Sequence, residues 1–122
     1  MVGGVIDSHC HLDAPEFAVD RAAVIARARA AGVVAQIIPA VTAASFDALA
    51  RLTASESDLH AAYGLHPMYL AEHRPEHLHQ VRERLSSGAA VAVGECGLDY
   101  FVEGLDPEQQ RHYFVAQVEL AR

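Results

Sequence analysis

The sequence predicts an α/β fold made of about four parallel βα units, which we expect to form one domain over residues 1–122. Short apolar runs that are typical of buried strands alternate four times with helix-like segments that have one apolar face. The alternation repeats about every 30 residues, the size of a βαβ unit, and such units place their strands parallel. No Gly/Ser linker or low-complexity stretch interrupts the 122 residues.

The first strand is expected at Val5–Asp7, a short apolar run that follows two glycines and leads into a polar segment. We interpret it as a buried strand. Residues 20–31 place apolar side chains on one helical face, and Gly32 is expected to end that helix. Residues 33–38 are nearly all apolar, rich in β-branched side chains and closed by Pro39. This run predicts a second strand that is covered on both faces.

The next two helices are predicted from capping and turn residues. Ser45 is expected to cap a helix that ends near the polar cluster 55–58. The third strand is expected at residues 59–65. Pro75 suits the first position of the following helix, and the Ser-Gly pair 87–88 is expected to close it.

The fourth strand is expected at residues 89–94, again as an apolar run. Asp106 is expected to cap the last helix, with Pro107 at its first helical position. The apolar stripe of this helix is expected to consist of Phe114, Val118 and Ala121.

Two architectures accommodate four parallel βα units: a doubly wound sheet and the first half of a TIM-type (β/α)8 barrel. The candidate functional residues all follow strands one, three and four, at the carboxyl ends where barrel active sites are built. Such barrels run to about 250 residues, so four units make close to half of one. We therefore predict the first half of a (β/α)8 barrel.

A histidine pair follows the first strand. His9 and His11 are separated by one residue, so a strand-like backbone points both imidazoles the same way and lets them share one metal ion. Cys10 points to the opposite face and is expected to pack in the core. A His-x-His pair alone is weak evidence for a metal, because such histidines are often ordinary surface or core residues. Glu95, beside glycines at the end of strand four, supplies a third ligand unless it is a solvated loop residue.

Four motifs at the expected places carry a family resemblance: DSHCHLD at the start, GLHP after strand three, GECGLDY after strand four, and a pattern on the last helix. The chain resembles the TatD family of metal-dependent hydrolases and deoxyribonucleases, which are amidohydrolase-like barrels. Cys96 stands where the family usually has an aliphatic residue such as Ile, a difference in packing volume only. The helix pattern consists of Gln110, Phe114, Gln117, Leu120 and Ala121.

The resemblance implies a site for two divalent metal ions, with Zn, Mn and Mg all suitable. His9 and His11 would bind one ion, and Glu95 would bridge it to the second as a catalytic ligand. The family completes this site with two histidines and an aspartate that follow strands five, six and eight, and these 122 residues include none of those strands. The implied reaction is hydrolysis of phosphodiester bonds in DNA by the full-length form. We expect these residues alone to hydrolyse little or nothing.

The resemblance also suggests substrate-binding residues. His66 in GLHP matches a position close to the substrate, although it could instead bond to backbone in a turn that Pro67 stiffens. Asp99 could hold a metal-ligating histidine by its second ring nitrogen, and Tyr100 could line the pocket. The remaining histidines are expected to have no role at the site. His73, His77 and His79 are expected on a solvated helix face, and His60 and His112 are assigned no function.

The composition limits how such a chain could bind DNA. The chain has 9 Lys plus Arg against 16 Asp plus Glu, a net charge of −7, which is the wrong sign for binding a phosphate backbone through basic side chains. A nucleic-acid substrate must then be held by metals. No apolar run of membrane-spanning length and no signal-peptide pattern occurs in the sequence, so we expect a cytoplasmic protein without membrane association. The two cysteines are expected to be free thiols.

Two other interpretations stay open. The strand-one motif alone also fits a different D-x-H-x-H hydrolase, such as a PHP-type phosphoesterase or another amidohydrolase, although GECGLDY argues against this. A non-catalytic or dimeric half-barrel binding module is the second alternative. Four parallel strands leave sheet edges and interior surface uncovered, which favours self-association through those edges.

Overall fold

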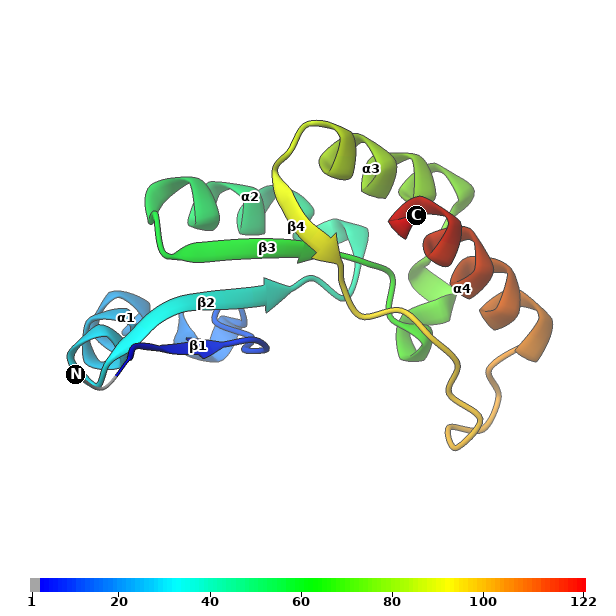
Figure 1. Cartoon of the computed structure of the whole chain (residues 1–122). Coiled ribbons are helices and arrows are strands. Elements are labelled where there is room, and N and C mark those ends of the chain that lie inside the picture. Colours follow the sequence, from blue (N-terminus) through cyan, green and yellow to red (C-terminus); the bar gives the residue numbers. More distant parts are fainter. Residues whose placement is uncertain (1–2) are drawn as a thin grey trace.

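The computed structural model describes residues 3–122, in which strands and helices alternate along the chain (Figure 1). The strands are β1 (Val5–Asp7), β2 (Val33–Pro39), β3 (Leu59–Tyr63) and β4 (Ala90–Val93), and the α-helices are α1 (Arg21–Ala30), α2 (Phe46–Ser55), α3 (Pro75–Ser86) and α4 (Pro107–Ala121). Three short 3-10 helices join them: η1 (Pro15–Phe17), η2 (Ala43–Ser45) and η3 (Pro67–Glu72). Within the described range, no helix combines the length and apolarity needed to cross a membrane.

The four strands form one sheet in the order β1-β2-β3-β4, and every pairing is parallel. This confirms the predicted parallel βα units. Each strand lies beside the strand of the preceding unit, as in a barrel, whereas a doubly wound sheet reverses its order at a switch point. Helix α2 packs on β3, α3 packs on β3 and β4, and α4 packs on β4 and α3 (Figure 1).

The core lies between the sheet and these helices. Phe46 at the start of α2 and Tyr63 at the end of β3 are fully buried, with ring centroids 5.0 Å apart and an interplanar angle of 74°. This edge-to-face geometry is a favoured arrangement of aromatic pairs. The other fully buried apolar residues of the largest size are Ile38, Leu49, Leu65 and Val81.

The prediction that the first strand is buried is wrong. Val5 and Ile6 are 59% and 60% exposed, because β1 pairs only with β2 and stands at the edge of the sheet. The second strand is also not covered on both faces, since Val34 is exposed, as is Val91 in β4. The sheet therefore carries uncovered apolar side chains on β1, β2 and β4.

The expected cap at Ser45 is also wrong. An N-cap residue needs an extended backbone to turn its side chain toward the helix start. Ser45 instead has helical angles, φ −90° and ψ −9°, as the last residue of η2. Its hydroxyl donates to the carbonyl oxygen of Thr42 at 2.8 Å. Helix α2 therefore begins without a side-chain cap.

The apolar stripe predicted for α4 is not the buried face of that helix. Val118 and Ala121 are exposed and Phe114 is only half-buried. The buried residues are Gln110, Tyr113 and Gln117. Apolar spacing was misleading here because the two glutamines satisfy their polar groups on backbone atoms of neighbouring loops.

The predicted cap at Asp106 is confirmed, since its Oδ1 accepts hydrogen bonds from Glu108 N at 2.9 Å and Gln109 N at 3.2 Å. Replacing Asp106 with alanine is expected to lower the free energy of unfolding by about 1 kcal/mol, as for other N-cap losses. Urea denaturation measures this change. Glu103→Ala removes the same charge from the exposed loop before the cap and is the control. A loss no greater in Asp106→Ala than in this control would contradict the capping role.

Candidate metal centre

Two imidazoles project together beyond β1. His9 N donates to the carboxylate of Asp7 at 3.1 Å, which fixes the first residues after the strand. His9 Nε2 and His11 Nε2 lie 3.2 Å apart, as the alternation predicts. The sulfur of Cys10 lies on the other side, 3.8 Å from both Gln36 Oε1 and the carbonyl oxygen of Ile37. Burial, with the nearby Asp7 charge, raises the pKa of the Cys10 thiol, which agrees with a packing role.

Helix α1 holds the segment that follows His11. The Arg21 guanidinium donates to the carbonyl oxygens of Leu12 at 2.7 Å, Asp13 at 3.3 Å and Ala14 at 3.2 Å. Three backbone carbonyls are thus fixed by one planar cation, whose donors have a rigid arrangement. The loop that carries both histidines is anchored at its far end.

Glu95 reaches the histidines because β3 and β4 end in close backbone contact. A Cβ atom at Gly94 would lie 2.8 Å from the carbonyl oxygen of Ala62, and one at Gly64 would lie 2.9 Å from the backbone of Gly94. Real Cβ atoms do not approach this closely, so only glycine fits at either position. The two glycines place Glu95 directly at the carboxyl end of the sheet.

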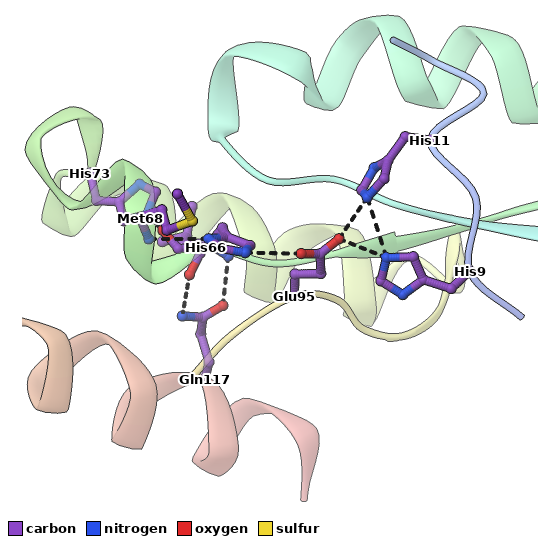
Figure 2. A network of polar contacts seen from close by, with 8 residues as sticks. His9, His11, His66, Met68, His73, Glu95 and Gln117 are labelled. Atoms are coloured by element: carbon purple, nitrogen blue, oxygen red, sulfur yellow. Dashed lines mark hydrogen bonds and ion pairs between the residues drawn. The ribbon is translucent and has the colours of Figure 1, made fainter. Parts of the chain in front are cut away.

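The three candidate ligands meet at one point (Figure 2). Glu95 Oε1 lies 2.9 Å from His9 Nε2 and 2.9 Å from His11 Nε2. Ligands bonded at about 2.0–2.2 Å to a common ion at near right angles are about 3 Å apart, so this spacing suits a divalent cation. Glu95 Oε1 is buried, and no donor among the described residues makes a hydrogen bond to it. A cation bound there would supply the missing partner.

His66 lies on the other side of the Glu95 carboxylate. Its Nε2 is 3.0 Å from Glu95 Oε2, and its Nδ1 accepts a hydrogen bond from Met68 N at 3.1 Å. Because Nδ1 is an acceptor, the ring proton is on Nε2 and faces Glu95. His66 therefore makes a backbone contact in its own turn and also lies beside Glu95, and its contact with a substrate stays a prediction. A cleft of about 540 Å³ opens beside this group, with Tyr69 and Met68 among its lining residues.

Asp99 and Tyr100 are not brought to this cluster. The Asp99 carboxylate accepts hydrogen bonds from Phe101 N at 2.9 Å and Val102 N at 3.1 Å, and so closes a turn in its own loop. Tyr100 is exposed, and neither residue lines the cleft beside Glu95. The structure thus groups His9, His11, His66 and Glu95 and leaves these two residues outside.

The expectation that His73 lies on a solvated helix face is wrong. His73 is buried, its Nε2 donates to the carbonyl oxygen of His66 at 2.7 Å, and its ring centroid lies 5.5 Å from that of Tyr113. It precedes α3, so the helical periodicity does not apply to it. His77 is half-buried at the start of α3, where its Nδ1 accepts from Arg74 N, whereas exposed His79 pairs with a glutamate one turn later.

The burial of His73 predicts a pH-dependent stability. Burial lowers the pKa of His73 below its usual value of 6.5, and nearby His77 adds to this effect. The unfolded chain therefore takes up a proton at higher pH than the folded chain does. Stability conferred by neutral His73 is present above pH 6.5 and is lost as the pH falls through the lowered folded-state pKa. Urea denaturation at about pH 7.5 and about pH 5 measures this loss.

His73→Gln, which does not titrate, is expected to weaken this pH dependence, while His79→Gln should leave it unchanged. If the free energy of unfolding changes equally with pH in the original chain and in His73→Gln, His73 does not cause the pH dependence.

Comparisons with known proteins show which family the chain resembles. The family model described as "TatD related DNase" matches residues 6–122. The chain is 40% identical over 124 residues to the uncharacterized metal-dependent hydrolase YjjV of Escherichia coli (strain K12), covering 100% of this chain and 48% of that protein. It is 36% identical over 118 residues to the 3'-5' ssDNA/RNA exonuclease TatD of Erwinia tasmaniensis, covering 96% and 46%.

A solved structure gives the same result. The crystal structure of YjjV, a TatD homolog from Escherichia coli K12, matches with a TM-score of 0.91 at 39% sequence identity, covering 99% of this chain and 48% of that chain. The likeness therefore extends to the arrangement of all the described elements. The chain spans about half the length of the relatives it matches.

Proposed function

The chain belongs to the TatD-related DNase family, and we propose that it supplies part of a metal site that hydrolyses phosphodiester bonds in DNA. The observation that carries this proposal is the convergence of His9, His11 and Glu95, whose ligand atoms all lie within 4.8 Å of one another. Relatives are named as metal-dependent hydrolases and as 3'-5' exonucleases on ssDNA and RNA, which supports this reaction class.

The roles of the residues follow from their contacts. His9, His11 and Glu95 would hold one divalent ion, and the Glu95 carboxylate, whose Oε2 contacts His66 Nε2, would be the group shared with a second ion. Bound divalent ions supply an activated water and positive charge beside the phosphate. This positive charge offsets the net charge of −7 on the chain. We propose that His66, which lies beside Glu95 and lines the cleft, contacts the substrate there.

The proposal is tested by metal binding and hydrolysis of single-stranded DNA with Mg²⁺, Mn²⁺ or Zn²⁺. The 122 residues alone are expected to bind metal weakly and to hydrolyse DNA near background, because they span about half the length of the relatives they match. A chimera joins residues 1–122 to the remainder of the Erwinia tasmaniensis exonuclease. It is expected to hydrolyse DNA in a metal-dependent way and to lose this activity with His9→Ala or Glu95→Ala. Activity that survives both substitutions would exclude the site.

The exposed apolar side chains favour a second property of these residues. Val5, Ile6, Val34 and Val91 stand uncovered on an open parallel sheet, and such edges associate with other strands. We therefore propose that the 122-residue chain self-associates through this surface. Light scattering after size exclusion should give a mass above 13.1 kDa, and a monomer at all accessible concentrations would refute it.

A further inference from the structure

Helix α4 carries two buried glutamines, Gln110 and Gln117, which lie seven residues apart. Seven residues are close to two helical turns, so both side chains leave the same face of the helix. Their exposed fractions are 1% and 0%, although glutamine is mostly exposed in proteins. A buried carboxamide is unfavourable unless its oxygen and nitrogen both find hydrogen-bond partners. Both do so here, and the partners belong to two different loops.

Gln117 binds the segment that carries His66. Its Oε1 accepts a hydrogen bond from Leu65 N at 2.7 Å, and its Nε2 donates to Leu65 O at 3.3 Å. The carboxamide thus pairs with the peptide groups of Leu65 as a neighbouring strand would. His66 itself is fixed on two more sides, because its N donates to Val41 O at 2.9 Å and its O accepts from His73 Nε2 at 2.7 Å. Figure 2 shows Gln117 reaching this segment from α4.

Gln110 repeats this arrangement on the loop that carries Glu95. Its Oε1 accepts from Asp99 N at 2.7 Å, and its Nε2 donates to Asp99 O at 2.8 Å. Asp99 follows Glu95 by four residues. The carboxylate of Asp99 closes the turn that leads away from the site, so this contact fixes the loop at the end of the GECGLD segment.

We propose that Gln110 and Gln117 are positioning residues that hold the Glu95 and His66 loops in one frame for the metal site. The peptide groups of Leu65 and Asp99 bond to carboxamides and not to a neighbouring strand, and a buried peptide group needs a partner. Two carboxamides from a single rigid helix meet this need in both loops at once. The side chains of His66 and Glu95 then lie 3.0 Å apart, from Nε2 to Oε2. The catalytic meaning of this frame rests on the function proposed above.

Methionine substitutions separate positioning from simple packing. Gln110→Met and Gln117→Met keep an unbranched side chain of similar length and remove the carboxamide. The readout in metal-free protein at fixed pH is the imidazole ¹⁵N resonances of His66 and the carboxyl ¹³C resonance of Glu95. Both variants are expected to shift these resonances. Gln109→Met, at an exposed position of the same helix, and Val81→Ala, a core substitution in α3, are expected to leave them in place.

Metal affinity gives a second readout. Both methionine variants are expected to raise the Co²⁺ dissociation constant about tenfold, as loss of an orienting contact does at other metal sites. The two controls should change it by no more than roughly twofold. Should the methionine variants fail to fold, Gln110→Asn and Gln117→Asn replace them. Each keeps the carboxamide but withdraws it by one methylene from the backbone groups of Asp99 or Leu65, so shifts of the same resonances are expected.

Folded variants that keep the His66 and Glu95 resonances and the Co²⁺ affinity of the original chain would overturn the proposal. Shifts of equal size in Val81→Ala would also overturn it, because they would reflect general destabilisation. If the original chain binds no Co²⁺, the metal site proposed above is contradicted, and the metal-free resonances still decide the role of the two glutamines.

Discussion

In the chimera described above, Glu95→Ala is expected to reduce the affinity for Mn²⁺ or Zn²⁺ by about 100-fold or more. Loss of a residue that merely orients a ligand already costs about 10–100-fold in metal affinity, and Glu95 is the proposed anionic ligand itself. Its Oε1 is the atom that both imidazoles approach at 2.9 Å. Isothermal titration calorimetry of the original and altered chains at one pH measures the effect. Glu95→Gln, which keeps the size but not the charge, is also expected to lower the metal affinity.

The control for this prediction is Glu103→Ala. Glu103 is an exposed glutamate of the loop between β4 and α4, so its loss changes the net charge equally. Metal affinity should be nearly unchanged in this variant. Equal affinities in Glu95→Ala and Glu103→Ala would mean that metal binds elsewhere, to surface carboxylates in general.

Phe46→Ala is expected to lower the free energy of unfolding by about 3–5 kcal/mol, the usual cost of removing a buried phenylalanine ring. Phe46 is 1% exposed and packs edge-to-face on Tyr63, so the substitution leaves a cavity and removes an aromatic pair. The loss is a large fraction of the stability of an ordinary domain. Urea denaturation followed by circular dichroism measures it.

Phe101 offers the matched control, since it is 95% exposed. Phe101→Ala is expected to change stability by no more than about 0.5 kcal/mol. Phe46→Leu, a smaller change, keeps the comparison possible if the alanine variant does not fold. If the urea concentration at the unfolding midpoint falls no further in the Phe46 variants than in Phe101→Ala, the contact between α2 and β3 is not central to the core.

Much of the fold could be predicted from local sequence because its elements depend on local features. Apolar runs, Gly32 and the Asp106-Pro107 start of α4 each act within a few residues of their own position. Burial could not be predicted in the same way. Val5 and Ile6 are exposed because β1 stands at the edge of the sheet and pairs only with β2. The apolar sequence of a strand does not reveal which elements will lie beside it.

The candidate site shows the same division. The convergence of His9, His11 and Glu95 could be predicted because parallel strands bring their carboxyl ends to one edge of the sheet. The placement of His73 and Gln117 could not. Gln117 bonds to the backbone of Leu65, 52 residues away, and His73 bonds to the backbone of His66 on the other side of η3, so neither partner follows from helical or strand periodicity. The local signal for the buried glutamines was their spacing, since Gln110 and Gln117 are seven residues apart and so lie on the same face of α4.

The order of the strands has a consequence for how the chain folds during synthesis. Each strand pairs with the strand made just before it, so the sheet can grow one unit at a time as the polypeptide leaves the ribosome. Helix α4 is made after all these strands, and only then can the Leu65–Gln117 and Asp99–Gln110 bonds close. A nascent chain thus displays Glu95 and His66 before their loops are fixed, whereas Arg21 of α1 can anchor the histidine loop earlier. Stable loading of metal should coincide with the docking of α4, not with the emergence of the ligands themselves.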